Sequence, residues 1–264
     1  MRTAILTWMI ARCSFAQSAQ EPQVIPLIVG FHSESIDSSY VASVTLILDD
    51  TTSIVVDTPS GTNAVGREGM LTTLINDGQL LPDQVNILVI THGHPDHFGH
   101  DMLFTNARHI FFAFEQTDTA FKPLNYQNGV AVLSRNVELW QTPGHTQQDT
   151  TVIVKNVPNQ GTVAITGDLI FDADDASNPS STQTDIAWNV ESLLLNRNRV
   201  LCVADFVVPG HGAMFQVTPQ MRQWARCEQV AGNQVPVQQT PRNTGAQLIR
   251  PSIFQRQEQL GYEN

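Results

Sequence analysis

Short runs of apolar and β-branched residues recur through the middle of the chain, between about Val24 and Trp224. Their length and composition predict strands, several of them buried on both faces. These strands are Val24–Val29, Val44–Leu48, Ser53–Val56, Asn86–Ile90, His109–Phe112, Val130–Leu133, Val137–Trp140, Thr151–Val154, Thr162–Ile165 and Val203–Val208.

Two segments instead show helical spacing. Asn63–Asp77 places Leu71, Leu74 and Ile75 on one face, and Asp185–Asn198 repeats its apolar positions in the same way. The polar segment Phe171–Gln183 is typical of a loop. Two groups of strands, each followed by a helix, predict a layered α/β domain with sheets inside and helices outside.

The domain is expected to cover residues 23–228. Residues 229–264 are rich in Gln, Pro, Asn and Thr, which predicts a disordered tail. Residues 1–22 form a leader whose apolar run Thr3–Ala11 resembles the central region of a signal peptide. Arg12 interrupts that run, which leaves it short for a signal peptide. We therefore expect a protein located in the cytoplasm, or in both the cytoplasm and the nucleus, and secretion is the alternative.

The charge balance narrows the choice of partners. The 264 residues carry a formal net charge of −11, and charged residues make up only 15%. This excludes a long cationic groove for duplex DNA, but it allows a site whose positive charge comes from bound metal. Three cysteines without a CxxC pair are too few for a disulfide scaffold or a structural zinc site. No later segment offers 18 unbroken apolar residues, so no membrane association is expected.

The chemistry is concentrated in Thr91–His97, which reads Thr-His-Gly-His-Pro-Asp-His and follows a predicted strand. His92 and His94 can present two imidazoles to one cation, while Asp96 and His97 face a second position. Zinc and related metals accept this mixture of nitrogen and carboxylate ligands.

Three further polar residues follow predicted strands, each in a glycine-containing turn. They are His145 in Pro-Gly-His, Asp168 in Thr-Gly-Asp and His211 in Pro-Gly-His-Gly. Strand-end loops of an α/β domain meet at one sheet edge, so we expect these residues to converge on the histidine cluster.

This pattern resembles the metallo-β-lactamase superfamily over about Val24 to Phe215. The resemblance implies an αββα sandwich with a two-metal site at the sheet edge. It implies that one metal is held by His92, His94 and His145, a second by Asp96, His97 and His211, and that Asp168 bridges the two. Asp57 matches a family aspartate that supports the histidine loop by hydrogen bonds instead of binding metal.

The bridging Asp168 argues against antibiotic hydrolysis, since true β-lactamases generally lack it. Arg199–Val217 and Val137–Val154 resemble a small glyoxalase II-like branch that is assigned to cleavage of histone pre-mRNA 3′ ends. The resemblance therefore implies an endoribonuclease on single-stranded RNA, with Asp96 and Asp168 as the catalytic carboxylates. The expected cofactors are two divalent ions, zinc first, with manganese or iron as alternatives.

Two other functions stay open. One is a glyoxalase II-like thioesterase or another hydrolase of small-molecule esters. The other is a metal protein with a single iron and dioxygen chemistry. A homodimer is also allowed.

Overall fold

The computed structural model describes residues 20–33, 39–178 and 184–230. Most of the proposed leader and tail therefore lies outside the described residues. The described residues belong to one compact unit. None of their helices combines the length and apolar character that a membrane span requires.

Two mixed sheets form the centre of this unit. In spatial order, the first sheet contains β1 (Gln23–Ile28), β4 (Val44–Asp49), β5 (Thr52–Val56), β6 (Ile87–Ile90), β7 (Arg108–Phe111), β8 (Phe114–Thr117) and β9 (Ala120–Pro123). The second contains β10 (Val130–Val132), β11 (Val137–Gln141), β12 (Thr150–Val157), β13 (Gly161–Ile165), β14 (Phe206–Val208) and β15 (Phe215–Gln216). A separate hairpin joins β2 (Phe31–Ser33) to β3 (Ser39–Val41).

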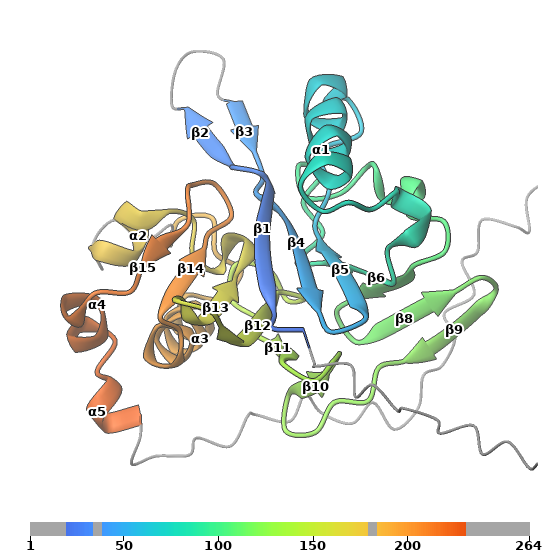
Figure 1. The fold of residues 1–264 in the computed structure, drawn as a ribbon. Coiled ribbons are helices and arrows are strands. Elements are labelled where there is room, and N and C mark those ends of the chain that lie inside the picture. Colours follow the sequence, from blue (N-terminus) through green and yellow to red (C-terminus); the bar gives the residue numbers. More distant parts are fainter. Residues whose placement is uncertain (1–19, 34–38, 179–183, 231–264) are drawn as a thin grey trace, which may run out of the picture. The chain divides into compact units, whose positions relative to one another are not determined.

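Helices cover the outer faces of both sheets (Figure 1). The first sheet carries α1 (Ala64–Asn76), and the second carries α3 (Val190–Val203) and α4 (Pro219–Trp224). The short helices α2 (Ala173–Ser177) and α5 (Cys227–Val230) lie beside α4. The order helix, sheet, sheet, helix confirms the predicted αββα sandwich.

Alternation along the strands builds the three apolar layers. In β5, Ile54 and Val56 point between the sheets, while Val55 points toward α1. In β12, Val152 packs between the sheets, and Ile153 packs against the helices on the other side. Because successive strand residues face opposite sides, strands that are buried on both faces read as unbroken apolar runs. This is why the apolar runs predicted so many strands correctly.

Three expectations about the elements are wrong. The second long helix begins at Val190, because the Asn189 side chain caps it by accepting a hydrogen bond from the Ser192 amide at 2.8 Å. It continues through Val203, since its apolar face packs against the second sheet, so β14 is shorter than the predicted strand. The predicted loop over 171–183 contains α2, which Asp172 caps by accepting from the Asp175 amide at 2.7 Å.

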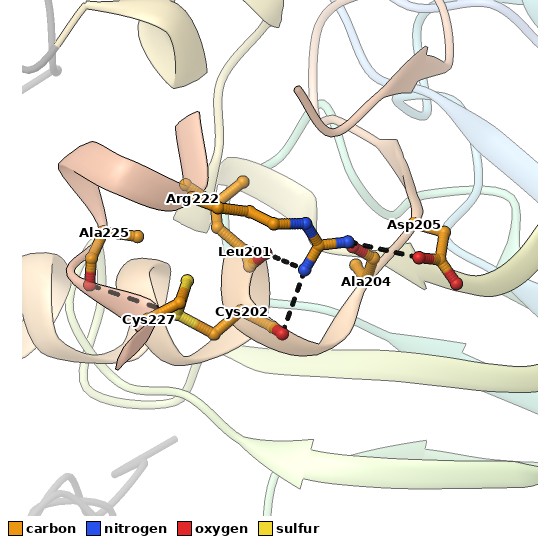
Figure 2. The surroundings of a disulfide bond; sticks show 7 residues. All are labelled: Leu201, Cys202, Ala204, Asp205, Arg222, Ala225 and Cys227. Carbon is orange, nitrogen blue, oxygen red and sulfur yellow. Dashed lines mark hydrogen bonds and ion pairs between the residues drawn. A yellow bond between two sulfur atoms is a disulfide. The ribbon is translucent and has the colours of Figure 1, made fainter. Parts of the chain in front are cut away.

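A disulfide joins Cys202 in α3 to Cys227 in α5 (Figure 2). Beside it, the Arg222 guanidinium donates to the carbonyl oxygens of Leu201, Cys202 and Ala204 at 2.7–3.2 Å. Arg222 thus satisfies carbonyl groups at the end of α3 that have no partner within the helix. Sequence reasoning did not foresee this pairing, because three cysteines do not reveal which of them meet.

Candidate metal centre

The Thr91–His97 loop follows the end of β6, and the side chain of Asp57 holds it in place by hydrogen bonds. Asp57 Oδ1 accepts from the Thr91 amide at 2.7 Å, and Oδ2 accepts from Thr91 Oγ1 at 2.8 Å. The same Oδ2 lies 2.8 Å from His97 Nδ1. The supporting role expected of Asp57 is confirmed by these contacts. Asp57 adopts a positive φ of 62°, an uncommon conformation for a residue other than glycine.

The structure brings all seven predicted donor residues together in two groups. The first group contains His92, His94, His145 and Asp168, and the second contains Asp96, His97 and His211. The donor atoms within each group lie no more than 4.8 Å from one another.

Asp168 stands between the two groups. Its Oδ2 lies 3.4 Å from His145 Nε2 and 3.7 Å from His92 Nε2. Its Oδ1 lies 3.1 Å from His97 Nε2 and 3.3 Å from His211 Nε2. Each carboxylate oxygen therefore faces a different set of imidazoles, which is the placement that a bridging ligand requires.

The spacing and pairing of the donors fit metal ions. Ligands about 2.0–2.2 Å from a tetrahedral zinc are separated from each other by about 3.3–3.6 Å. The direct contacts across the two groups span 3.0–3.7 Å. Among the described residues, His92 Nε2, His97 Nε2 and Asp168 Oδ1 are buried, and their contacts with neighbouring polar atoms lack the geometry of a hydrogen bond. Buried polar atoms of this kind call for a ligand.

The buried imidazoles and carboxylates of the cluster strongly shift one another's pKa values. Burial by itself would lower the pKa of His97, but the carboxylates of Asp168 and Asp57 hold it well above its ordinary value. Burial by itself would raise the pKa of Asp168, but His97 and His211 hold it well below. Burial and the neighbouring His97 lower the pKa of His92, which keeps that imidazole neutral, as a metal ligand must be.

Contacts behind the donors orient their rings. His211 Nδ1 lies 3.0 Å from the carbonyl oxygen of Val41 in the β2–β3 hairpin, and the Tyr40 ring packs edge-on against His211 at 5.7 Å. Such second partners direct the other ring nitrogen toward the metal position. Sequence reasoning missed Tyr40 and Val41. The only available signal was the short polar and apolar alternation of Ser39–Val41.

The loop that carries His145 is fastened on two sides. Asp149 accepts from the Thr146 amide at 2.8 Å and from Thr146 Oγ1 at 2.5 Å. Burial raises the pKa of Asp149 to about 7, although the hydrogen bonds from Thr146 act to lower it. The Trp188 amide, just before α3, donates to the carbonyl oxygen of His145 at 2.9 Å.

Glycine is required where the backbone approaches the bridging carboxylate. A Cβ at Gly210 would stand 2.0 Å from Asp168 Oδ1, and Gly167 has a positive φ of 52°. The glycine turns that marked Asp168 and His211 in the sequence therefore serve close packing around one carboxylate.

The remaining histidines do not join the cluster. His100 Nδ1 lies 3.1 Å from the carbonyl oxygen of Pro59, and His109 Nε2 lies 3.0 Å from that of Phe104. His32 Nε2 lies 2.8 Å from Asp172 Oδ2.

Comparison with known proteins yields one family. The model of the "Metallo-beta-lactamase superfamily" matches residues 40–211. "Uncharacterized protein C03F11.2" of Caenorhabditis elegans is 40% identical over 216 residues, which are 79% of this chain and 59% of that protein. "Metallo-beta-lactamase domain-containing protein 1" of Homo sapiens is 36% identical over 160 residues, which are 60% of this chain and 58% of that protein. The chain thus spans about three-fifths of the length of these relatives.

Solved structures share the fold. A putative metallo-beta-lactamase from Thermotoga maritima superposes with a TM-score of 0.57 at 16% identity, covering 75% of this chain and 100% of that one. A quorum-quenching N-acyl homoserine lactone hydrolase gives 0.51 at 20% identity, covering 69% and 86%. At these identities the likeness concerns the fold alone.

Proposed function

The chain belongs to the metallo-β-lactamase superfamily, and we propose that it is a two-metal hydrolase that cleaves phosphodiester bonds of single-stranded RNA. The main support for a metal-dependent hydrolase is the position of Asp168, which offers one oxygen to each of two histidine groups. A single iron would leave the second group of donors without a function, so the arrangement favours two ions.

In this proposal His92, His94 and His145 would hold one ion, Asp96, His97 and His211 would hold the other, and Asp168 would serve both. Two divalent ions in such a site supply a water activated at neutral pH and positive charge beside the oxygen that becomes negative.

The chain's own residues supply order and access. Asp57 and Thr91 fix the histidine loop, so the donor atoms need little rearrangement when metal binds. Gly93, His94 and Pro95 are exposed, which places the opening of the site at this part of the loop. The Asp96 side chain is 24% exposed against 5% for Asp168. The Asp96 carboxylate is therefore the more accessible of the two for accepting a proton from the attacking water.

The choice of RNA rests on the likeness of Arg199–Val217 and Val137–Val154 to the glyoxalase II-like branch described above. The net charge of −11 is unfavourable for a broad phosphate-binding surface. A ligand that needs only a few contacts, such as a flexible single strand, is therefore favoured over a duplex. A small ester or thioester is the competing substrate for the same donor set, and its hydrolysis would use the same carboxylates.

Metal analysis and two substrates test the proposal. We expect about two zinc or manganese ions per chain, cleavage of single-stranded RNA, and loss of cleavage in Asp168→Asn, because an amide bridges two cations poorly. The matched control is Asp172→Asn, which alters a nearby carboxylate outside the seven donors. Metal-loaded protein that leaves RNA intact but hydrolyses a glutathione thioester would show that the substrate is an ester. One iron per chain would contradict the hydrolase itself.

A further inference from the structure

Three exposed phenylalanines form a ridge beside the opening of the metal centre. They are Phe111 in β7, Phe114 in β8 and Phe121 in β9, and their exposed fractions are 41%, 43% and 65%. β8 and β9 form the hairpin that ends the first sheet (Figure 1). Among the described residues, no neighbouring side chain buries these three rings as a core residue is buried.

The strand register places the three rings on one face. Phe111 is paired with Phe114 across β7 and β8, and Gln116 is paired with Phe121 across β8 and β9. Directly paired residues, and residues two apart on a strand, point to the same side of a sheet. The Phe114 and Phe121 rings are stacked, with centroids 4.8 Å apart and planes inclined by 18°.

This ridge reaches the metal-binding loop. A Cβ added to Gly93, the residue between His92 and His94, would lie 3.7 Å from Phe111 Cζ. The Phe111 ring therefore lies against the exposed part of the loop, and Phe114 and Phe121 continue away from it.

The chemistry of the ridge favours flat ligands on an open surface. The other residues of β7, β8 and β9 on this face are His109, Gln116 and Pro123. None of them is acidic, so these three strands place no carboxylate on this face although the chain as a whole is strongly negative. An acyl chain would need an enclosing pocket to bury its surface, whereas an exposed ring can stack with a base on one side.

A second copy of the chain is not expected to extend this sheet by pairing with β9. The outermost strand β9 contains Lys122 and Pro123, two residue types that oppose strand-to-strand pairing at a sheet edge. The edge is thus protected from association, while the rings on the adjoining face stay exposed.

We infer that the Phe111–Phe114–Phe121 ridge stacks unpaired bases of the RNA strand and leads it to the metal centre. This inference rests on the proposed ribonuclease function and specifies how that site selects an unpaired strand. A duplex, whose bases already stack on each other, has no free faces for the ridge.

Steady-state cleavage of heptaadenylate and heptauridylate RNA by the metal-loaded full chain tests the inference. Adenine stacks more strongly than uracil, so the wild type is expected to show the lower KM for heptaadenylate. In Phe121→Ala we expect the KM for heptaadenylate to rise about fivefold or more, with a much smaller change in kcat and a reduced difference between the substrates. Phe121→Trp should keep the low KM, because it keeps an aromatic face.

Two further variants separate stacking from other roles. Phe121→Leu keeps apolar surface but no ring, so it should behave like Phe121→Ala; wild-type KM in this variant would overturn base stacking. Trp224→Ala removes an exposed aromatic from α4 in the opposite outer layer and should leave KM unchanged. Sedimentation of each variant shows whether the ridge instead holds two copies together, and dissociation of a dimer with unchanged KM would overturn the inference.

The outcome for the wild type distinguishes the two proposals. RNA cleavage with equal KM in wild type and Phe121→Ala would overturn the ridge and keep the ribonuclease. Absence of RNA cleavage by the wild type would overturn the ribonuclease and, with it, the role of the ridge.

Discussion

Individual side chains at this site act through the partners behind them. Asp57 receives three contacts from Thr91 and His97, so one buried carboxylate orients the start and the end of the histidine loop. Asp168 divides its two oxygens between two groups of imidazoles. Changing one of these residues is therefore expected to alter metal binding and to leave the sheets intact.

His211→Ala should remove metal from the second position only. The first position keeps three imidazoles, so we expect about one ion per chain in place of about two, with little change in the melting temperature of the metal-free protein. Elemental analysis of dialysed protein measures the ratio. The control is His100→Ala, since His100 contacts the Pro59 carbonyl and not the donors. Two ions retained in His211→Ala would contradict the assignment.

Asp49 makes stability sensitive to acid. Burial alone would raise its pKa, but hydrogen bonds from Ser134 and Asn136, with Arg135 nearby, hold it below its ordinary value. The ionised carboxylate therefore stabilises the fold above the unfolded-state pKa of about 4, and this stabilisation is lost as pH falls through the lower folded-state pKa.

We expect Asp49→Asn to lower the free energy of unfolding by about 1–3 kcal/mol at pH 7 and to weaken its fall in acid. Urea unfolding at pH 7, 5 and 3 measures both effects. Asp50→Asn, at the exposed neighbouring position, is the matched control. Equal acid sensitivity in wild type and Asp49→Asn would show that other carboxylates carry the effect.

At the scale of elements, the end of the domain depends on a covalent link. The four-residue helix α5 is too short to be stable alone, and the disulfide between Cys202 and Cys227 attaches it to α3. Arg222 of α4 binds carbonyl groups at the same end of α3. Three helices are thus joined near one point on the outer face of the second sheet.

Removing this link by the double substitution Cys202→Ser and Cys227→Ser should lower the free energy of unfolding by about 2–4 kcal/mol. Denaturant unfolding with and without a reducing agent measures the change. The wild type in reductant should match the double variant, and the variant itself should not respond to reductant. A wild type that is insensitive to reductant would contradict a stabilising disulfide.

At the scale of the whole molecule, charge limits how RNA can bind. The net charge of −11 leaves few cationic contacts for phosphates, so metals and aromatic stacking must supply much of the affinity. We expect the slope of log K against log salt for a single strand to correspond to only a few contacts, at about −0.7 for each. Titration of a labelled single strand between low and physiological salt measures it. A steep slope would indicate a cationic surface outside the described residues.

The disulfide also bears on the compartment. Disulfides persist in oxidising environments, so the Cys202–Cys227 link favours secretion over the cytoplasmic location that the short apolar run of the leader favours. For a secreted protein we expect the native amino terminus near Gln17 or Gln20 and both cysteines protected from alkylation. A native chain beginning at Met1 or Arg2 with reactive Cys202 and Cys227 would contradict this. A secreted enzyme would not meet nuclear pre-mRNA, so the measurement also tests that substrate.

Local patterns determined much of this protein. Apolar and β-branched runs define most of the central strands, since a strand that is buried on both faces needs apolar side chains at consecutive positions. The clustering of the candidate donors was also predictable, because His92, His94, Asp96 and His97 lie within six positions of a loop and His145, Asp168 and His211 each follow a strand.

Tertiary structure decided what depends on residues far apart in the chain. The Val41 carbonyl reaches His211 across 170 positions, and no local pattern encodes that contact. The end of α3 depends on packing against the second sheet, and the cysteine pair depends on where α5 lies. The aromatic ridge likewise exists only because strand pairing puts three phenylalanines on one face. Long-range contacts of this kind form when the chain packs, so short sequence windows do not contain them.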